Sequence, residues 1–162
     1  MMFHAINRLI DSVDWNPEAE DWESYLRGIA ATMWSLMADH PGFAARLYEL
    51  DRLTPASREM QRLSVARLVD FGWGIPEAFL ILDAIGDMTG DTVLRIQTGP
   101  DPADLAEQFR DSENRADPIS DEIDNYVVDV LGADPREWWQ RKLDLLLAGA
   151  RYTLAPHPSG EN

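Results

Sequence analysis

Residues 75–98 read IPEAFLILDAIGDMTGDTVLRIQT, and this stretch decides the fold class. Side chains of one stripe recur in it at the spacing of one face of an α-helix: Phe79, Leu82, Ile85, Met88 or Thr89, Val93 and Ile96. The part from Thr92 to Ile96 is β-branched enough for a strand, but it continues the same helical stripe without a break. The stretch therefore predicts one long helix from Pro76 to Thr98.

The proline near the start of that helix belongs to a pattern that recurs along the chain. It is found in Asn16-Pro17, His40-Pro41, Thr54-Pro55, Ile75-Pro76, Asp101-Pro102, Asp117-Pro118 and Asp134-Pro135. Proline suits the first helical turn, where its missing N–H would have no partner, and it pushes the preceding residue toward extended backbone. Asn, Thr and Asp are also good N-caps. The pattern predicts seven helix starts, with one further helix already running at Phe3.

The rest of the chain also favours helices over strands. Helical stripes begin at Trp22 and at Trp139, and no Asn-Gly or Asp-Gly hairpin turn separates alternating apolar runs. We expect Gly72, Gly99 and Gly132 to end helices in the left-handed conformation. The prediction is an all-α, multi-helix bundle of about seven to eight helices over residues 1–154, followed by a polar, disordered tail at 155–162.

The composition excludes several classes of function. Fourteen Lys and Arg against 29 Asp and Glu leave a net charge of −15, which argues against binding a nucleic-acid backbone. The absence of cysteine excludes disulfides, thiolate nucleophiles and Cys-ligated metals, and it fits a reducing cytoplasm. The longest uncharged run, from Gly28 to Ala38, is far shorter than the roughly 20 apolar residues that cross a bilayer.

Two features of the long helix invite a chemical interpretation. Asp83, Asp87 and Asp91 share one stripe, so they either hold a hard cation such as Mg²⁺ or form a solvated face. Gly86 and Gly90 lie one turn apart and remove side chains from one face. Because each glycine costs up to about 1 kcal/mol in a helix, we expect close helix–helix packing there; the alternative is a kink beside a cavity.

Catalytic and cofactor motifs are absent. The three histidines form no His-x-x-x-His pair, and neither a Gly-x-Ser-x-Gly nucleophile motif nor a phosphate loop occurs. We therefore predict no catalytic residue, no cofactor, no bound metal and no enzymatic activity. A carboxylate–metal helical hydrolase that uses Asp83, Asp87 and Asp91 remains an alternative.

The middle helices carry many aromatic and methionine side chains. Such residues usually fill a core, but in a small helical domain they can also enclose an apolar cavity. By helix position, the expected lining residues are Met33, Trp34, Met37, Phe71, Phe79 and Leu82.

The order of landmarks resembles a known family. Asp21-Trp22 opens a helix that runs to His40-Pro41; the next helix ends at Phe71-Gly72, and the long helix and a final helix from Trp138-Trp139 follow. From about Asp14 to Leu154, this order is similar to the C-terminal ligand-binding and dimerisation domain of TetR-family transcriptional regulators. The N-terminal helix-turn-helix part of those regulators has no counterpart before Phe3, so no nucleic-acid contact is expected from this chain.

The resemblance implies a ligand pocket for a small apolar molecule around the helices near Gly72. It also implies a homodimer formed by the helices Pro76–Thr98 and Pro135–Leu154. The expected interface residues are Ile85, Gly86, Thr89, Gly90, Val93, Trp139, Leu143, Leu146 and Ala150. Ligand binding would shift the first helix. An alternative is an interaction module that heterodimerises with a full-length regulator and titrates it.

Overall fold

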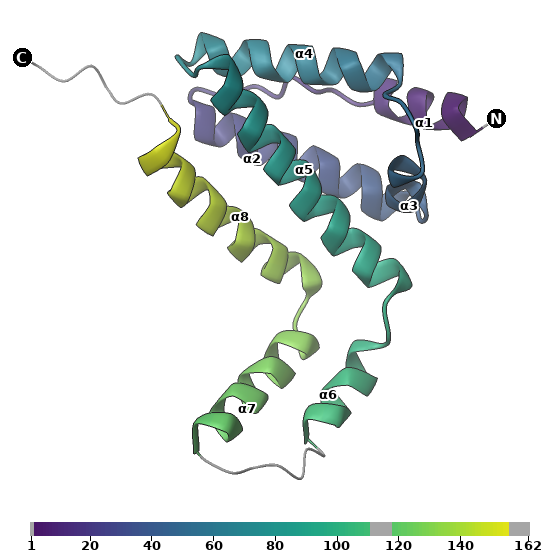
Figure 1. The fold of residues 1–162 in the computed structure, drawn as a ribbon, viewed down its shortest axis with the longest axis vertical. Helices are drawn as coiled ribbons and strands as arrows, with labels where there is room; N and C mark the ends of the chain where they lie inside the picture. The colour runs from purple at the N-terminus through teal and green to yellow at the C-terminus, as the bar shows by residue number, and fades with distance from the viewer. Residues whose placement is uncertain (1, 111–117, 156–162) are drawn as a thin grey trace, which may run out of the picture.

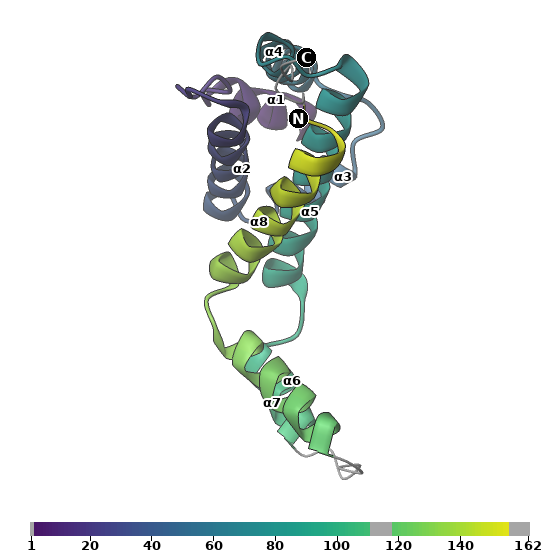
Figure 2. The same cartoon turned by 90° about the vertical axis from the view of Figure 1, so that its left-hand side faces the viewer.

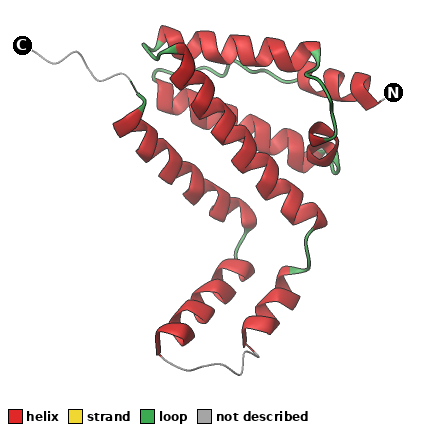
Figure 3. Ribbon diagram, viewed as in Figure 1, coloured by secondary structure: helices red, strands yellow, loops and turns green. Residues whose placement is uncertain are grey.

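The computed structural model describes residues 2–110 and 118–155, and within these ranges it contains eight helices and no strand (Figures 1 and 3). The helices are α1 (Met2–Asp11), α2 (Trp22–Asp39), α3 (Phe43–Tyr48), α4 (Pro55–Asp70), α5 (Ile75–Thr98), α6 (Pro102–Arg110), α7 (Pro118–Gly132) and α8 (Pro135–Thr153). The predicted all-α bundle of seven to eight helices is confirmed.

The long helix α5 organises the body of the molecule. It packs against α2, α3, α4 and α8, while α1 packs against α3 and α4. Helices α6 and α7 pack against each other and project away from this body as a hairpin (Figures 1 and 2). The body therefore holds the core, and the hairpin is an appendage inserted between α5 and α8.

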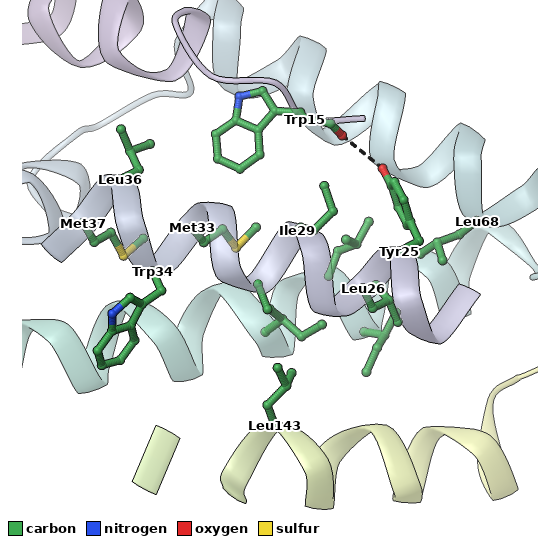
Figure 4. Packing of buried hydrophobic residues seen from close by; sticks show 14 of the residues in the cluster. Trp15, Tyr25, Leu26, Ile29, Met33, Trp34, Leu36, Met37, Leu68 and Leu143 are labelled. Carbon is green, nitrogen blue, oxygen red and sulfur yellow. Dashed lines mark hydrogen bonds between the residues drawn. The ribbon is translucent and has the colours of Figure 1, made fainter. Parts of the chain in front are cut away.

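The core is built around α2, which is apolar on two sides. Tyr25, Leu26, Ile29 and Ala30 are fully buried in it. Figure 4 shows Leu68 of α4 near Tyr25 and Leu143 of α8 below the opposite side of the helix. Neighbouring helices therefore cover two sides of α2, whereas a surface helix would carry a polar face on one of them.

Most of the predicted helix starts are correct. Helices α4, α6, α7 and α8 begin at the expected prolines, and α5 begins one residue before Pro76. The Thr54 hydroxyl accepts from the Ser57 N–H at 3.1 Å, and the Asp134 carboxylate accepts from the Arg136 N–H at 2.9 Å. These bonds satisfy amide groups that have no partner within the first helical turn.

Two of the starts are wrong. Helix α3 begins at Phe43 after Gly42, which takes a φ of 83°, and no helix begins at Pro17. Helix α2 begins instead at Trp22, where the Asp21 carboxylate accepts from the Ser24 N–H at 2.8 Å.

The loop before α2 is held by buried side chains rather than by a helix. The Trp15 indole donates to the Ile10 carbonyl at 2.7 Å, and the Tyr25 phenol donates to the Trp15 carbonyl at 3.2 Å. Pro17 lies against Gly28 of α2. These tertiary contacts, which no local pattern encodes, outweigh the capping signal of Asn16.

Only one of the three expected left-handed glycines adopts that conformation. Gly72 has a φ of 91° and donates to Val69, while Trp73 donates to Leu68, which is the Schellman arrangement. Gly99 is extended because Pro100 follows it and disfavours helical backbone at the preceding residue. Gly132 is the last residue of α7 and has no positive φ.

The C-terminal boundary of the body lies slightly beyond the expected one. The Ala155 N–H donates to the Ala150 carbonyl at 2.9 Å, and Ala155 is buried. The rest of the predicted tail, residues 156–162, lies outside the described residues. Across the described ranges, none of the helices combines the length and apolarity needed to cross a membrane.

Candidate functional site

The body contains a cavity of about 460 Å³ that is bounded by α1 to α5. Helices α2 and α3 contribute five apolar side chains to its wall, those of Met33, Leu36, Met37, Phe43 and Leu47. Helices α1, α4 and α5 and the loops beside them complete the wall with Ile10, Trp15, Leu50, Leu53, Met60, Val65, Phe79 and Leu82. The cavity is open to solvent on one side, because its wall includes the exposed side chains of Tyr48, Leu53 and Phe79.

Four of the six expected lining residues border this cavity. They are Met33, Met37, Phe79 and Leu82. Met33, Met37 and Leu82 are buried, whereas Phe79 lies at the surface with 48 % of its area exposed.

Trp34 and Phe71 do not border the cavity. Trp34 faces α8, where its ring centroid lies 4.7 Å from that of Trp139. Phe71 lies 6.2 Å from the Tyr25 ring and 4.5 Å from the Arg67 guanidinium. Trp34 therefore packs α2 against α8, and Phe71, which directly follows α4, packs against Tyr25 of α2.

Sequence reasoning missed the contributions of α1, α3 and the loop before α4. Phe43 and Leu47 are four residues apart on α3, a spacing that predicts a shared face. No local signal marks Trp15 or Leu50 as lining residues, because both lie outside helices and reach the cavity only through the tertiary fold.

The cavity wall carries two serines with different surroundings. The Ser57 hydroxyl lies 2.9 Å from the Thr54 hydroxyl. The Ser64 hydroxyl is buried, with 2 % of the residue exposed. Burial raises the pKa of the Tyr25 phenol, and a hydrogen bond with the Ser64 side chain opposes that rise.

The remaining polar wall residues are mostly acidic. Asp51, Asp83 and Asp87 border the cavity, together with Arg52. All four are exposed, so they lie where the cavity opens to solvent.

Tyr48 also borders the cavity. Partial burial raises the pKa of its phenol, and the negative charges of Asp87 and Asp91 raise that pKa further.

The three stacked aspartates do not act as one group. Asp91 pairs with Arg95 at 2.9 Å, whereas Asp83 and Asp87 border the cavity. Within residues 2–110 and 118–155, no group of three or more His, Cys, Asp or Glu side chains is arranged to hold a metal ion.

The two glycines of α5 have different neighbours. A Cβ added at Gly86, which borders the cavity, would meet no atom within 4 Å. A Cβ at Gly90 would lie 2.5 Å from the Tyr48 hydroxyl. Within the described chain, no helix backbone approaches these glycines closely. Gly90 accommodates the Tyr48 side chain of α3, and Gly86 faces open space.

The residues expected at a dimer interface are mostly covered by the chain itself. Ile85, Thr89, Gly90 and Val93 of α5 are buried, as are Trp139, Leu143 and Ala150 of α8. Gly86 borders the cavity, and Leu146 is half-buried.

One hydrogen bond shows how this burial arises. The Trp139 indole donates to the Thr89 hydroxyl at 3.0 Å, which joins α8 to α5 within one chain. The outward face of α8 instead presents Leu145 and Tyr152, which are 77 % and 78 % exposed.

A second apolar surface lies on the projecting hairpin. Ile119, Ile123 and Tyr126 of α7 are all largely exposed. Their spacing of four and three residues places them on one helix face. No family model, curated protein or solved structure matches the chain.

Proposed function

We propose that this chain is the effector-sensing and dimerisation domain of a TetR-like transcriptional regulator, acting in the cytoplasm. It binds a small, mainly apolar molecule in the cavity between α1 and α5 and forms a homodimer through its C-terminal helices. The observation that carries this proposal is the cavity of about 460 Å³ with a mainly apolar wall.

The size and lining of the cavity support ligand binding. Small-molecule sites commonly have volumes of roughly 300–1,000 Å³, with mostly apolar walls and a few polar groups that orient the ligand. The present cavity falls in that range, and most of its wall residues are apolar.

The position of α1 supports a sensing role. Ile10 of α1 borders the cavity, so an occupant would touch this helix. The Asn7 side chain of the same helix accepts from the Ala56 N–H of α4 at 2.9 Å. A bound molecule that pushes α1 outward would therefore change the packing of α1 against α4. This movement matches the expected shift of the first helix on ligand binding.

A cavity-filling variant tests ligand binding. The probe is 1-octanol, titrated by isothermal calorimetry. Gly86→Phe places a ring in the open space beside α5, whereas Gly149→Phe makes the same change on the exposed side of α8, where a Cβ also meets nothing within 4 Å. We expect saturable binding to the wild type and to Gly149→Phe, and at least tenfold weaker binding to Gly86→Phe. Absence of saturable binding to the wild type contradicts the proposal.

The homodimer is tested separately. Leu145 and Tyr152 form the most exposed apolar part of α8. Light scattering should give the mass of a dimer for the wild type and of a monomer for Leu145→Glu/Tyr152→Glu. Leu80→Glu is the matched control, because it adds a charge at an exposed apolar position of α5. A wild-type monomer at micromolar concentration would contradict dimerisation.

The exposed face of α7 favours a second candidate, in which the chain pairs with a full-length regulator and titrates it. Ile119, Ile123 and Tyr126 present apolar area that a helical partner would cover. In this case the chain alone is monomeric, and mixing it with such a regulator lowers the amount of regulator homodimer.

A further inference from the structure

We propose that two copies of this chain clasp each other reciprocally, with the α7 face of each copy packed against the α8 face of the other. The α7 face is the exposed apolar stripe of Ile119, Ile123 and Tyr126, and the α8 face is that of Leu145 and Tyr152. This inference rests on the homodimer of the proposed function, because it specifies the surfaces through which that dimer forms.

The projecting hairpin gains little from its own packing. Helices α6 and α7 contain 9 and 15 residues; Ala106 of α6 is buried, and α7 buries none of its residues. Isolated helices shorter than roughly 12–15 residues are marginal in water, and helices in proteins gain most of their stability by packing an apolar face. A surface that covers the α7 face would therefore stabilise the hairpin.

Carboxylates lie along one edge of the α7 face. Glu122 is within one helical turn of Ile119 and Tyr126, and Asp129 is within one turn of Tyr126. Both carboxylates are exposed, and neither forms an ion pair with a residue of the ranges 2–110 and 118–155. Helix α7 contains four acidic residues and neither Lys nor Arg. The surface that fits this face is therefore apolar with cations beside it.

The α8 face has that chemistry. Arg141 and Lys142 precede Leu145 by four and three residues, so both lie beside it on the helix surface. Neither cation has an ion-pair partner among the described residues, and the Arg141 guanidinium lies 5.7 Å from the centre of the Trp138 ring. The neighbouring carboxylate of Asp144 is already paired with Arg27 at 2.6 Å.

These charges favour one way of pairing two copies. Packing α7 against α7 would bring carboxylates together, and packing α8 against α8 would bring cations together, whereas α7 against α8 joins opposite charges. Within one chain the two faces do not cover each other, because α7 lies beyond the start of α8 rather than beside it (Figures 1 and 2). A two-fold axis between the copies forms the α7–α8 contact twice.

Charge reversal with complementation tests this pairing. Glu122→Lys/Asp129→Lys and Arg141→Glu/Lys142→Glu should each weaken the dimer about tenfold or more in sedimentation equilibrium, because each variant places like charges across both contacts. An equimolar mixture of the two variants should recover the dimer, because both contacts of the mixed dimer again join opposite charges.

Asp104→Lys/Glu107→Lys is the matched control. It makes the same change in net charge at two exposed positions of α6, outside the α7 face. This variant should form a dimer as strong as that of the wild type. An equal loss in the control would overturn the inference, because net charge and not the α7 face would then set the strength of the dimer.

Cross-linking identifies the neighbouring helices without reversed charges. The chain contains no cysteine, so Ile123→Cys and Leu145→Cys each carry a single thiol. Treated with a short bismaleimide, neither variant alone should give a cross-linked dimer, whereas their mixture should, because the α7 thiol of one copy then lies near the α8 thiol of the other.

The outcomes separate this inference from the proposed function. A dimer that survives both charge reversals, a mixture that does not recover it, or cross-linking of Leu145→Cys alone overturns the α7–α8 pairing and leaves the homodimer standing. A wild type that remains monomeric overturns the pairing and the homodimer together, and leaves ligand binding by the cavity intact.

Discussion

Replacing Gly86 by alanine should stabilise the protein. Gly86 lies inside α5 with ordinary helical backbone, and a Cβ there would meet no atom within 4 Å. Alanine stabilises a helix interior by roughly 0.5–1 kcal/mol relative to glycine, because glycine has more backbone conformations in the unfolded state and loses more entropy on folding. With nothing to displace, Gly86→Ala should raise the free energy of unfolding by about that amount.

Gly90→Ala is the matched comparison, because it makes the same change one turn later on the same helix. Its Cβ would lie 2.5 Å from the Tyr48 hydroxyl and 3.2 Å from the ring carbon that carries it. Tyr48 is 53 % exposed and can move aside, but leaving its preferred rotamer costs about 0.5–1.5 kcal/mol. That cost offsets the helix gain, so Gly90→Ala should be less stable than Gly86→Ala by a similar amount.

Urea unfolding followed by tryptophan fluorescence measures both free energies. For a chain of this size, 1 kcal/mol corresponds to a shift of about 2–4 °C in Tm, so calorimetry gives an independent check. The Tyr48→Ala background removes the obstructing ring. In that background Gly90→Ala should recover the same gain as Gly86→Ala.

A destabilising effect of Gly86→Ala would refute the reasoning. It would mean that another side chain fills the space beside α5, and hence that the cavity does not extend to Gly86. The proposed ligand site would then lose one of its walls. Equal gains for the two alanine variants in the wild-type background would contradict the placement of Tyr48 against Gly90.

Three further predictions concern the contacts that hold the body together. Thr89→Val should lower the free energy of unfolding by about 1–3 kcal/mol, because it leaves the buried Trp139 indole N–H without its acceptor. A urea titration that shows no loss of stability would mean that this hydrogen bond is absent. Thr54→Ala removes the N-cap of α4 and should cost about 0.5–2 kcal/mol in the same assay, and an unchanged midpoint would contradict the cap. The hydrogen bond from Arg151, together with the Arg27 hydrogen bond and charge, lowers the pKa of the Glu23 carboxyl below its ordinary value of 4.5. The ionised carboxylate therefore stabilises the fold above about pH 4.5, and this stabilisation is lost as the pH falls through the folded-state pKa. Glu23→Gln should therefore destabilise the protein at neutral pH, with a difference from the wild type that disappears in acid; a difference independent of pH would exclude this ion pair as its cause.

The helices could be predicted largely because their signals are local. A proline and a capping side chain act within one turn, which is why Thr54 and Asp134 mark true starts. At Asn16-Pro17 the prediction failed because contacts of buried side chains decided the backbone. Asn16-Pro17 carries the same signal, but the buried Trp15 side chain holds that segment as a loop.

The candidate site could be predicted only in part. Met33, Met37, Phe79 and Leu82 were found because helix position and residue type bring large apolar side chains to the middle of the bundle. Trp34 was assigned to the same wall, yet it stacks on Trp139, because which side of a buried helix faces a cavity depends on the helices around it. Periodicity identifies an apolar face and not the neighbour that covers it.

By itself the sequence determined the helical character of the chain, the places where most helices begin and the strong negative charge, because propensity, capping and charge act on neighbouring residues or on the whole composition. Only the tertiary structure decided that Asp83 and Asp87 border a cavity. It likewise decided that the apolar stripes of α5 and α8 are buried within one chain. Such outcomes depend on how helices distant in sequence cross, and crossing geometry comes from the packing of all their side chains together.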